Sequence, residues 1–165
     1  MKVLATPLTR RALLVGAAVV SGAAVASGAI ASPALAAAKP AVKVWKDPGC
    51  GCCGAWVQHM RSNGFDVVVT DTPDMEAVKT RLGVPQNLLS CHTATVGGYT
   101  IEGHVPASAI RRLLAERPKA IGLAAPGMPS GSPGMEGGPV ETYDVVLFGD
   151  GAVKRFERYR GHDKV

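Results

Sequence analysis

Hydrophobic and polar residues alternate over several short stretches of the chain, and each stretch predicts a strand. The first runs from Ala41 to Lys46 and is followed by the turn-forming residues Asp47-Pro48-Gly49. Further strands are expected at residues 65–70, 93–96, 99–102, 144–148 and 152–159. Gly97-Gly98 and Gly149-Asp150-Gly151 lie between neighbouring strands and predict two hairpins.

Apolar residues that recur every three or four positions predict three helices. Trp56, Val57 and Met60 line one face of the first helix, which follows the turn and begins at a cysteine-rich segment. The first helix is expected to end at Asn63-Gly64. The second has Thr72 as its cap, Pro73 as its first residue and Gly83 as its stop. The third is expected to begin at Pro106 and to end at Pro118.

The resulting order, β-α-β-α-β-β-α followed by a C-terminal hairpin, predicts an α/β fold of the thioredoxin-like sandwich type. Residues 119–139 are rich in Gly, Pro and Met and show no periodicity, so we expect a loop there. The expected domain covers residues 42–160, with a short linker at 37–41 and a tail at 161–165.

The first 36 residues have the pattern of a cleavable export signal. Arg10 and Arg11 precede an uncharged apolar stretch from Ala12 to Ile30, and the small residues Ala34-Leu35-Ala36 predict cleavage after Ala36, with Ala38 as the neighbouring alternative. The arginine pair is typical of a twin-arginine signal, which exports folded chains. An ordinary secretory signal and an uncleaved membrane anchor are the alternatives that this pattern leaves open.

Removal of the signal changes the charge of the chain. The 165 residues carry a net charge of +5, but three of the 18 basic residues lie in the signal, so 15 basic and 13 acidic residues remain. With a net charge of +2 after cleavage, and only 5% aromatic residues over the full sequence, the chain has neither the basic nor the stacking surface of a nucleic-acid binder. We therefore expect no nucleic-acid partner, and no membrane contact after cleavage.

Three of the four cysteines, Cys50, Cys52 and Cys53, lie within four residues, and Cys91 precedes the third strand. Adjacent Cα atoms are about 3.8 Å apart, which is too close for a relaxed disulfide, so a bond between Cys52 and Cys53 is not expected. Two sets of pairings remain open: Cys50–Cys52 with Cys53–Cys91, and Cys50–Cys53 with Cys52–Cys91. Because both close little chain, the spacing favours metal or redox chemistry over a disulfide framework.

Thiols at a helix N-terminus are deprotonated more easily, and thiolate is a soft ligand that suits Cu(I), zinc or iron–sulfur centres. Export narrows this choice to copper or zinc. Met128 and Met135 favour copper because thioethers bind Cu(I) and because both lie in the expected loop; an exposed linker without function is the alternative for them.

The histidines give weaker signals. His92 and His104 lie near the expected site, and each fits a hydrogen-bonded structural role as well as a ligand role. His59 is expected on the solvated surface. Glu102 and Glu136 are candidates for hydrogen-bonding partners of the ligands, since carboxylates are poor ligands for Cu(I).

Several longer blocks resemble a known family, the domain-of-unknown-function family that includes the CopG-type copper-resistance proteins. The blocks are Lys46-Asp47-Pro48-x-Cys50-Gly51-Cys52-Cys53-x-x-Trp56, Gly83-Val84-Pro85, Ser90-Cys91-His92-Thr93, Gly103-His104-Val105-Pro106-Ala107 and Gly127-Met128-Pro129-x-Gly131-Ser132-Pro133-Gly134-Met135-Glu136. The resemblance implies a periplasmic, thioredoxin-like protein whose four cysteines hold copper and which is often encoded among copper-handling systems, so other periplasmic copper-handling proteins are the expected partners.

Three functions compete on the sequence. The first is a periplasmic copper-binding protein in copper resistance, with Cu(I) on the four cysteines, zinc as the alternative metal, and Met128 and Met135 as ligands where copper enters or leaves. The second is a thiol–disulfide or copper oxidoreductase in which Cys50 and Cys53 act as a Cys-x-x-Cys pair. The third is an interaction domain stapled by disulfides.

Overall fold

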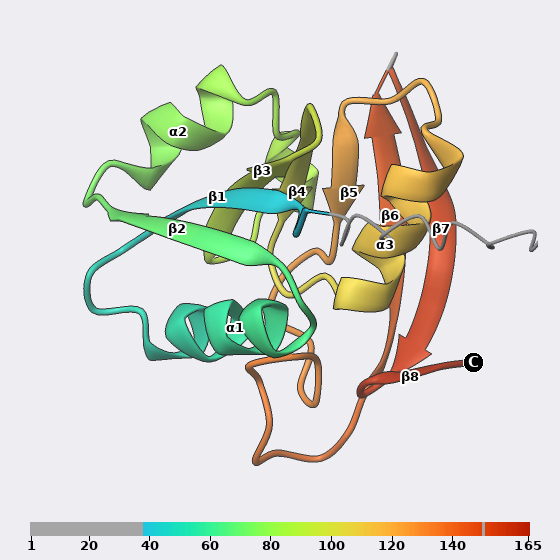
Figure 1. The fold of residues 1–165 in the computed structure, drawn as a ribbon. Coiled ribbons are helices and arrows are strands. Elements are labelled where there is room, and N and C mark those ends of the chain that lie inside the picture. Colours follow the sequence, from blue (N-terminus) through green and yellow to red (C-terminus); the bar gives the residue numbers. More distant parts are fainter. Residues whose placement is uncertain (1–37, 150) are drawn as a thin grey trace, which may run out of the picture. The chain divides into compact units, whose positions relative to one another are not determined.

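The computed structural model describes residues 38–149 and 151–165, so the expected signal at 1–36 lies outside the described residues. These residues form one eight-stranded sheet, three α-helices and a 3-10 turn (Figure 1). The elements are β1 Ala41–Lys46, α1 Gly51–Ser62, β2 Asp66–Asp71, α2 Met75–Arg81, η1 Gln86–Leu88, β3 His92–Val96, β4 Tyr99–Glu102, α3 Ala107–Glu116, β5 Gly122–Ala124, β6 Thr142–Gly149, β7 Ala152–Arg160 and β8 Asp163–Lys164.

The strands lie in the order β2-β1-β3-β4-β5-β6-β7-β8. β1 pairs in parallel with β2 and β4 with β5, whereas the other neighbours are antiparallel. Parallel neighbours need a crossover connection, and α1 and α3 supply the two crossovers.

Helices cover both faces of the sheet (Figure 1). Trp56 and Met60 of α1 and Ile110 and Leu113 of α3 are fully buried in one core with the inward-facing side chains of β1, β3 and β4. The opposite face of β1 carries Trp45, which contacts Arg81 of α2. In the part of the chain that the structure describes, no helix is long and apolar enough to cross a membrane.

The expected α/β class and the order of the first seven elements are confirmed. The bounds of β1 and β4 are those predicted from alternation. The assignment to a thioredoxin-like sandwich stays a prediction.

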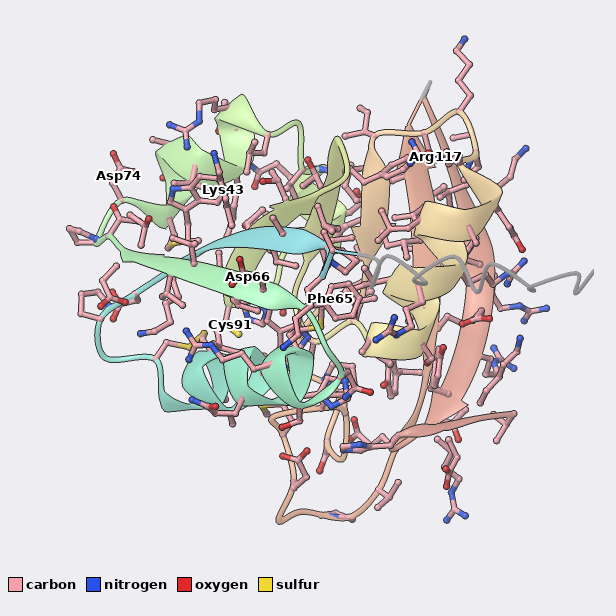
Figure 2. All side chains as sticks on the ribbon, viewed as in Figure 1. Lys43, Phe65, Asp66, Asp74, Cys91 and Arg117 are labelled. Carbon is pink, nitrogen blue, oxygen red and sulfur yellow. A yellow bond between two sulfur atoms is a disulfide. The ribbon has the colours of Figure 1, made fainter. Side chains whose placement is uncertain are left out.

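The second helix begins later than expected. Asp74 caps α2 by accepting the backbone N–H of Ala77 at 3.0 Å, while the hydroxyl of Thr72, the expected cap, accepts the N–H of Asp74 at 3.1 Å. Both residues can cap a helix, and a turn at Thr72 moves the helix start two residues onward. Figure 2 shows Asp74 at this start of the helix.

Residues 119–139 are not wholly a loop, as the composition had predicted. Gly122–Ala124 form β5, which pairs with both β4 and β6 and is completely buried. A three-residue strand that is buried on both faces has no alternation, and for this reason periodicity does not detect it. The expected tail likewise contains the short strand β8.

His59 is half-buried, which corrects its expected place on the solvated surface. Its Nε2 accepts the backbone N–H of Ala107, the first residue of α3, at 3.1 Å. The side chain therefore satisfies one of the free amides at the start of that helix.

Candidate metal centre

The turn after β1 places three cysteines at the start of α1. Asp47 organises this turn: its side chain accepts the N–H of Gly49 at 2.8 Å, and its carbonyl accepts the N–H of Cys50 at 3.0 Å. Cys50 is the N-cap of α1, so Cys52 and Cys53 lie in the first helical turn. The expectation that the cysteines gather at this helix end is confirmed.

Trp56 anchors this first turn in the core. Its ring is fully buried, and its Nε1–H donates to the carbonyl of Val105 at 2.9 Å. Cys53, one turn earlier on the helix, is also fully buried. The start of α1 is therefore fixed against the segment that leads into α3.

Cys50 and Cys53 are joined by a disulfide, with their Cα atoms 5.4 Å apart. This differs from the expected set of four free thiolates, because only Cys52 and Cys91 are free in this state. The N-cap and the third helical residue lie on one face of the helix at a separation that a disulfide spans readily.

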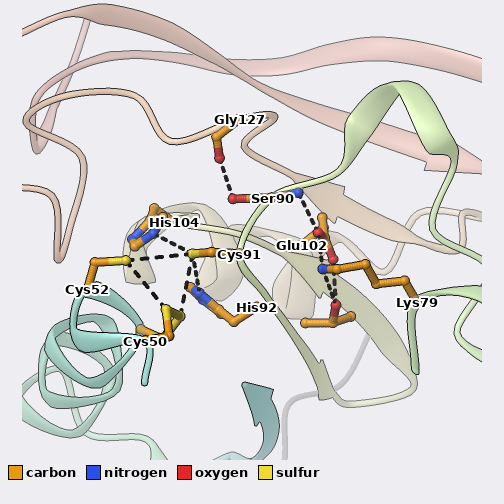
Figure 3. A network of polar contacts seen from close by, with 11 residues as sticks. Cys50, Cys52, Lys79, Ser90, Cys91, His92, Glu102, His104 and Gly127 are labelled. Atoms are coloured by element: carbon orange, nitrogen blue, oxygen red, sulfur yellow. Dashed lines mark hydrogen bonds and ion pairs between the residues drawn. A yellow bond between two sulfur atoms is a disulfide. The ribbon is translucent and has the colours of Figure 1, made fainter. Parts of the chain in front are cut away.

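Cys91 faces the disulfide from the segment before β3 (Figures 2 and 3). Its Sγ lies 3.5 Å from Sγ of Cys53 and 3.8 Å from Sγ of Cys52, and Sγ of Cys52 lies 3.5 Å from Sγ of Cys50. All four sulfur atoms lie within 4.8 Å of one another. The fold therefore brings together the four cysteines singled out in the sequence.

The environment keeps Cys91 protonated in the metal-free protein. Burial, and then the charge and hydrogen bond of the neighbouring Cys52, raise the pKa of the Cys91 thiol to about 12. Two thiolates in contact repel each other, so the second proton is lost only when a cation compensates the charge.

His104 lies on the other side of Cys91. Its Nε2 is 3.0 Å from Sγ of Cys91, and its Nδ1 is 2.8 Å from the carbonyl of Pro133. A carbonyl accepts only, so Nδ1 carries the proton and Nε2 presents its lone pair to the sulfur. Burial lowers the pKa of His104, which keeps this imidazole neutral.

His92 is completely buried between the rings of Trp56 and His104, at centroid distances of 4.5 and 4.9 Å. Its Nδ1 lies 3.4 Å from Sγ of Cys91, and its Nε2 has no hydrogen-bond partner among the described residues. Burial lowers the pKa of His92 well below its usual value. One nitrogen of each imidazole therefore lies within 4.8 Å of the Cys91 sulfur.

The segment after β5 packs against the cysteines. The backbone at Gly134 approaches α1 so closely that an added Cβ would lie 2.7 Å from the carbonyl oxygen of Cys52. Met135 follows it and is half-buried, whereas 55% of Met128 is exposed. The role of either methionine as a copper ligand stays a prediction.

A buried polar network behind Cys91 was only partly foreseen. Glu102 was expected as a partner of the ligands, but it contacts Lys79, Thr93 and the backbone of Ser90 instead of a cysteine or histidine. No sequence signal singled out Lys79, because a lysine beside an apolar residue such as Val78 is ordinary in an amphipathic helix. Glu136, the other expected partner, binds His162 at 2.8 Å.

The donor atoms at this site fit a soft metal ion. Four sulfur atoms and two imidazoles converge, and the unpartnered Nε2 of the buried His92 is a polar atom that the fold leaves without a hydrogen bond. Such a set suits Cu(I) or zinc, and does not suit magnesium or calcium, which require oxygen ligands. Reduction of the disulfide makes all four sulfurs available.

Comparison with known proteins gives two kinds of match. The profile of a family described as "Protein of unknown function, DUF411" matches residues 88–135, which include Cys91, both buried histidines and the two loop methionines. Two solved structures named "Copper resistance protein copG", form 2 and form 1, are each 46% identical to the chain with a TM-score of 0.70. The matches cover 73% and 74% of this chain and 98% and 100% of those chains. No curated protein matches the chain.

Proposed function

The chain belongs to the DUF411 family, together with the copper resistance protein CopG, and we propose on this basis that it binds Cu(I) through Cys50, Cys52, Cys53 and Cys91. The observation that carries the proposal is the convergence of four sulfur atoms within 4.8 Å. Atoms this close can bridge neighbouring copper ions as well as hold a single ion, since thiolate sulfur has several lone pairs.

Two observations favour copper over zinc: the names of the related proteins and a methionine near the cysteines. A tetrahedral site of four cysteines also suits zinc, but the relatives of the chain are named for copper resistance. The half-buried Met135 follows the glycine that packs against Cys52, and thioethers bind Cu(I) far better than zinc. We assign His92 and His104 to additional ligand or hydrogen-bonding roles at the same centre, and Met128 and Met135 to the path by which copper enters or leaves.

The test is a competition experiment on the reduced protein. Cu(I) is titrated in the presence of bathocuproine disulfonate, and zinc is titrated separately against a zinc chelator. We expect the wild type to withdraw Cu(I) from the competitor and the variant with all four cysteines replaced by serine to lose this ability, whereas His162→Gln, outside the centre, retains it. Equal binding by the four-serine variant, or tighter binding of zinc than of Cu(I), would contradict the proposal.

A second function is favoured by one observation, the Cys50–Cys53 disulfide with a free thiol against each of its sulfurs. This arrangement suits a thiol–disulfide oxidoreductase, in which a substrate dithiol gives two electrons and two protons to the disulfide and leaves as a disulfide. The metal-free protein would then catalyse the reduction of insulin by a dithiol, and Cys50→Ser would abolish it. The absence of exchange by the wild type excludes this function.

We further propose that residues 1–36 direct the chain to the periplasm, that they are removed after Ala36, and that the exported domain works with other periplasmic copper-handling proteins. The apolar stretch and the small residues at 34–36 support this proposal. The N-terminal residue of the protein recovered from a periplasmic extract tests cleavage. Loss of export in the R10K/R11K variant would identify the twin-arginine route, and unchanged export would identify the general secretory route.

A further inference from the structure

A carboxylate that touches neither a cysteine nor a histidine is buried directly behind the metal centre. Glu102, the last residue of β4, has no exposed surface. Its Oε1 accepts from Lys79 Nζ and from the backbone N–H of Ser90, both at 2.6 Å, and its Oε2 accepts from the hydroxyl of Thr93 at 2.6 Å. Lys79 Nζ also donates to the Thr93 hydroxyl at 3.0 Å.

Two of these contacts lie on either side of the segment that carries the candidate ligands. Ser90 and Thr93 are the residues immediately before and after Cys91-His92, so one carboxylate holds both ends of this pair. Figure 3 shows Glu102 between Lys79 and Ser90, with Cys91 on the far side of the segment. Contacts from further away complete the restraint: Gly103 N–H donates to the carbonyl of His92 at 2.9 Å, and the Ser90 hydroxyl donates to the carbonyl of Gly127.

A buried ion pair is a poor explanation for stability. Two charges lose their hydration on burial, and a pair of apolar side chains of similar size often stabilises a fold equally well. The Lys79–Glu102 pair does provide directional contacts, which apolar packing lacks. A charged carboxylate accepts short, strong hydrogen bonds from three donors at once and so defines the position of each.

The segment needs such a restraint because it has little regular structure. Ser90 and Cys91 lie between the 3-10 turn η1 and the start of β3, where no ladder of backbone hydrogen bonds fixes them. The Cys91 sulfur must nevertheless stay close to sulfurs on α1, an element 38 residues earlier in the chain. Small displacements of a ligand weaken a metal site, and residues that orient ligands affect metal affinity accordingly.

We propose that Glu102, held by Lys79, is a positioning residue that fixes the Ser90–Thr93 segment and thereby sets the place of the Cys91 sulfur opposite α1. The proposal rests on the proposed function, because it identifies how the copper ligands are oriented. Glu102 acts through Ser90 and Thr93 and does not touch the metal.

The experiment compares three variants of the protein. Glu102→Gln removes the charge and the acceptor for Thr93, and Thr93→Val removes only the hydroxyl donor. Val145→Ala, at a fully buried position of β6 away from the centre, is a control for general loss of stability.

Two properties are measured on folded samples. The first is the Cu(I) affinity of the reduced protein in competition with bathocuproine disulfonate. The second is the rate at which diamide links Cys52 to Cys91 in the protein that retains the Cys50–Cys53 disulfide. In the second reaction the two thiols lose two electrons and two protons to diamide.

We expect Glu102→Gln and Thr93→Val to lower both the Cu(I) affinity and the linking rate about tenfold, and Val145→Ala to change neither. If Glu102→Gln fails to fold, Thr93→Val decides the outcome alone. Affinities and rates within twofold of the wild type, or an equal loss in Val145→Ala, would overturn the positioning role. If the wild type does not bind Cu(I), the proposed function fails, and the linking rates still decide whether Glu102 positions Cys91.

Discussion

The Nε2 atom of His104 lies 3.0 Å from the sulfur of Cys91, while its Nδ1 binds the Pro133 carbonyl at 2.8 Å. The backbone of the loop after β5 therefore orients an imidazole toward a cysteine that comes 13 residues earlier in the chain. This contact links the loop to the metal centre through one ring.

Replacement of His104 by glutamine should weaken Cu(I) binding about tenfold to a hundredfold, since the lone pair at Cys91 and the link to Pro133 are both lost. The affinity of the reduced variant for Cu(I) is measured against bathocuproine disulfonate. His162→Gln serves as the matched control because His162 binds Glu136 and lies outside the centre. An equal loss of affinity in both variants would show that the orientation of His104 is not the cause.

Gly134→Ala should destabilise the protein by about 1–3 kcal/mol and expose Cys52 to alkylating reagents. Gly134 has a φ of 88°, and an added Cβ would meet the backbone of Cys52 and Trp56 at 2.7 Å, so the loop must move away from α1. Gly137→Ala separates the cost of a positive φ from the cost of the clash with α1. Gly137 has a φ of 108°, but nothing lies within 4 Å of its added Cβ. Urea unfolding and the rate of Cys52 alkylation are the measurements, and a rate in Gly134→Ala no faster than in Gly137→Ala would contradict the close packing.

The metal-free protein should lose stability as the pH falls below about 6.5. Burial lowers the pKa values of His92 and His104 in the folded state, so in acid the unfolded chain binds protons that the folded chain does not. The free energy of unfolding therefore decreases as the pH falls, by up to about 1.4 kcal/mol per pH unit for each histidine. Urea midpoints at pH 7.5, 6.5 and 5.5 test this, and His104→Gln should have a shallower slope. A stability that is constant over this range would contradict it.

Arg117→Gly should stabilise the protein by about 1 kcal/mol. Arg117 lies at the end of α3 (Figure 2). Its φ of 47° is a left-handed conformation, which costs a residue with a side chain more than it costs glycine. Thermal unfolding is the measurement, and Arg112→Gly, within the helix and therefore destabilising, provides a comparison of opposite sign. A lower melting temperature for Arg117→Gly would contradict the expectation.

The cysteines and the strand β1 were predictable because their signals are local. Alternation over six residues predicted β1. The crowding of Cys50, Cys52 and Cys53 indicated metal or redox chemistry at the start of the first helix. The place of Cys91 beside them followed from the expected thioredoxin-like arrangement, in which the loop before the third strand passes beside the start of the first helix.

Contacts between distant residues were not predictable in the same way. Lys79 and Glu102 are 23 residues apart, and neither residue shows in the sequence that it is buried against the other. The strand β5 has three residues and no alternation, and its identity depends on neighbours on both sides. Which cysteines pair also depends on geometry: Cys50 and Cys53 share one face of α1 and form a disulfide, whereas Cys52 and Cys91 stay free with their sulfurs 3.8 Å apart.

The pairing of β5 with β6 indicates where foreign sequence can be added to this protein. The loop after β5 starts and finishes at strands that are paired with each other, so its length does not set their separation. Gly137, at the exposed part of this loop, has open space around it and follows Glu136 by one residue. An insertion there, such as a short tag or a fluorescent probe, would report on the neighbourhood of the candidate metal ligands while leaving the sheet intact.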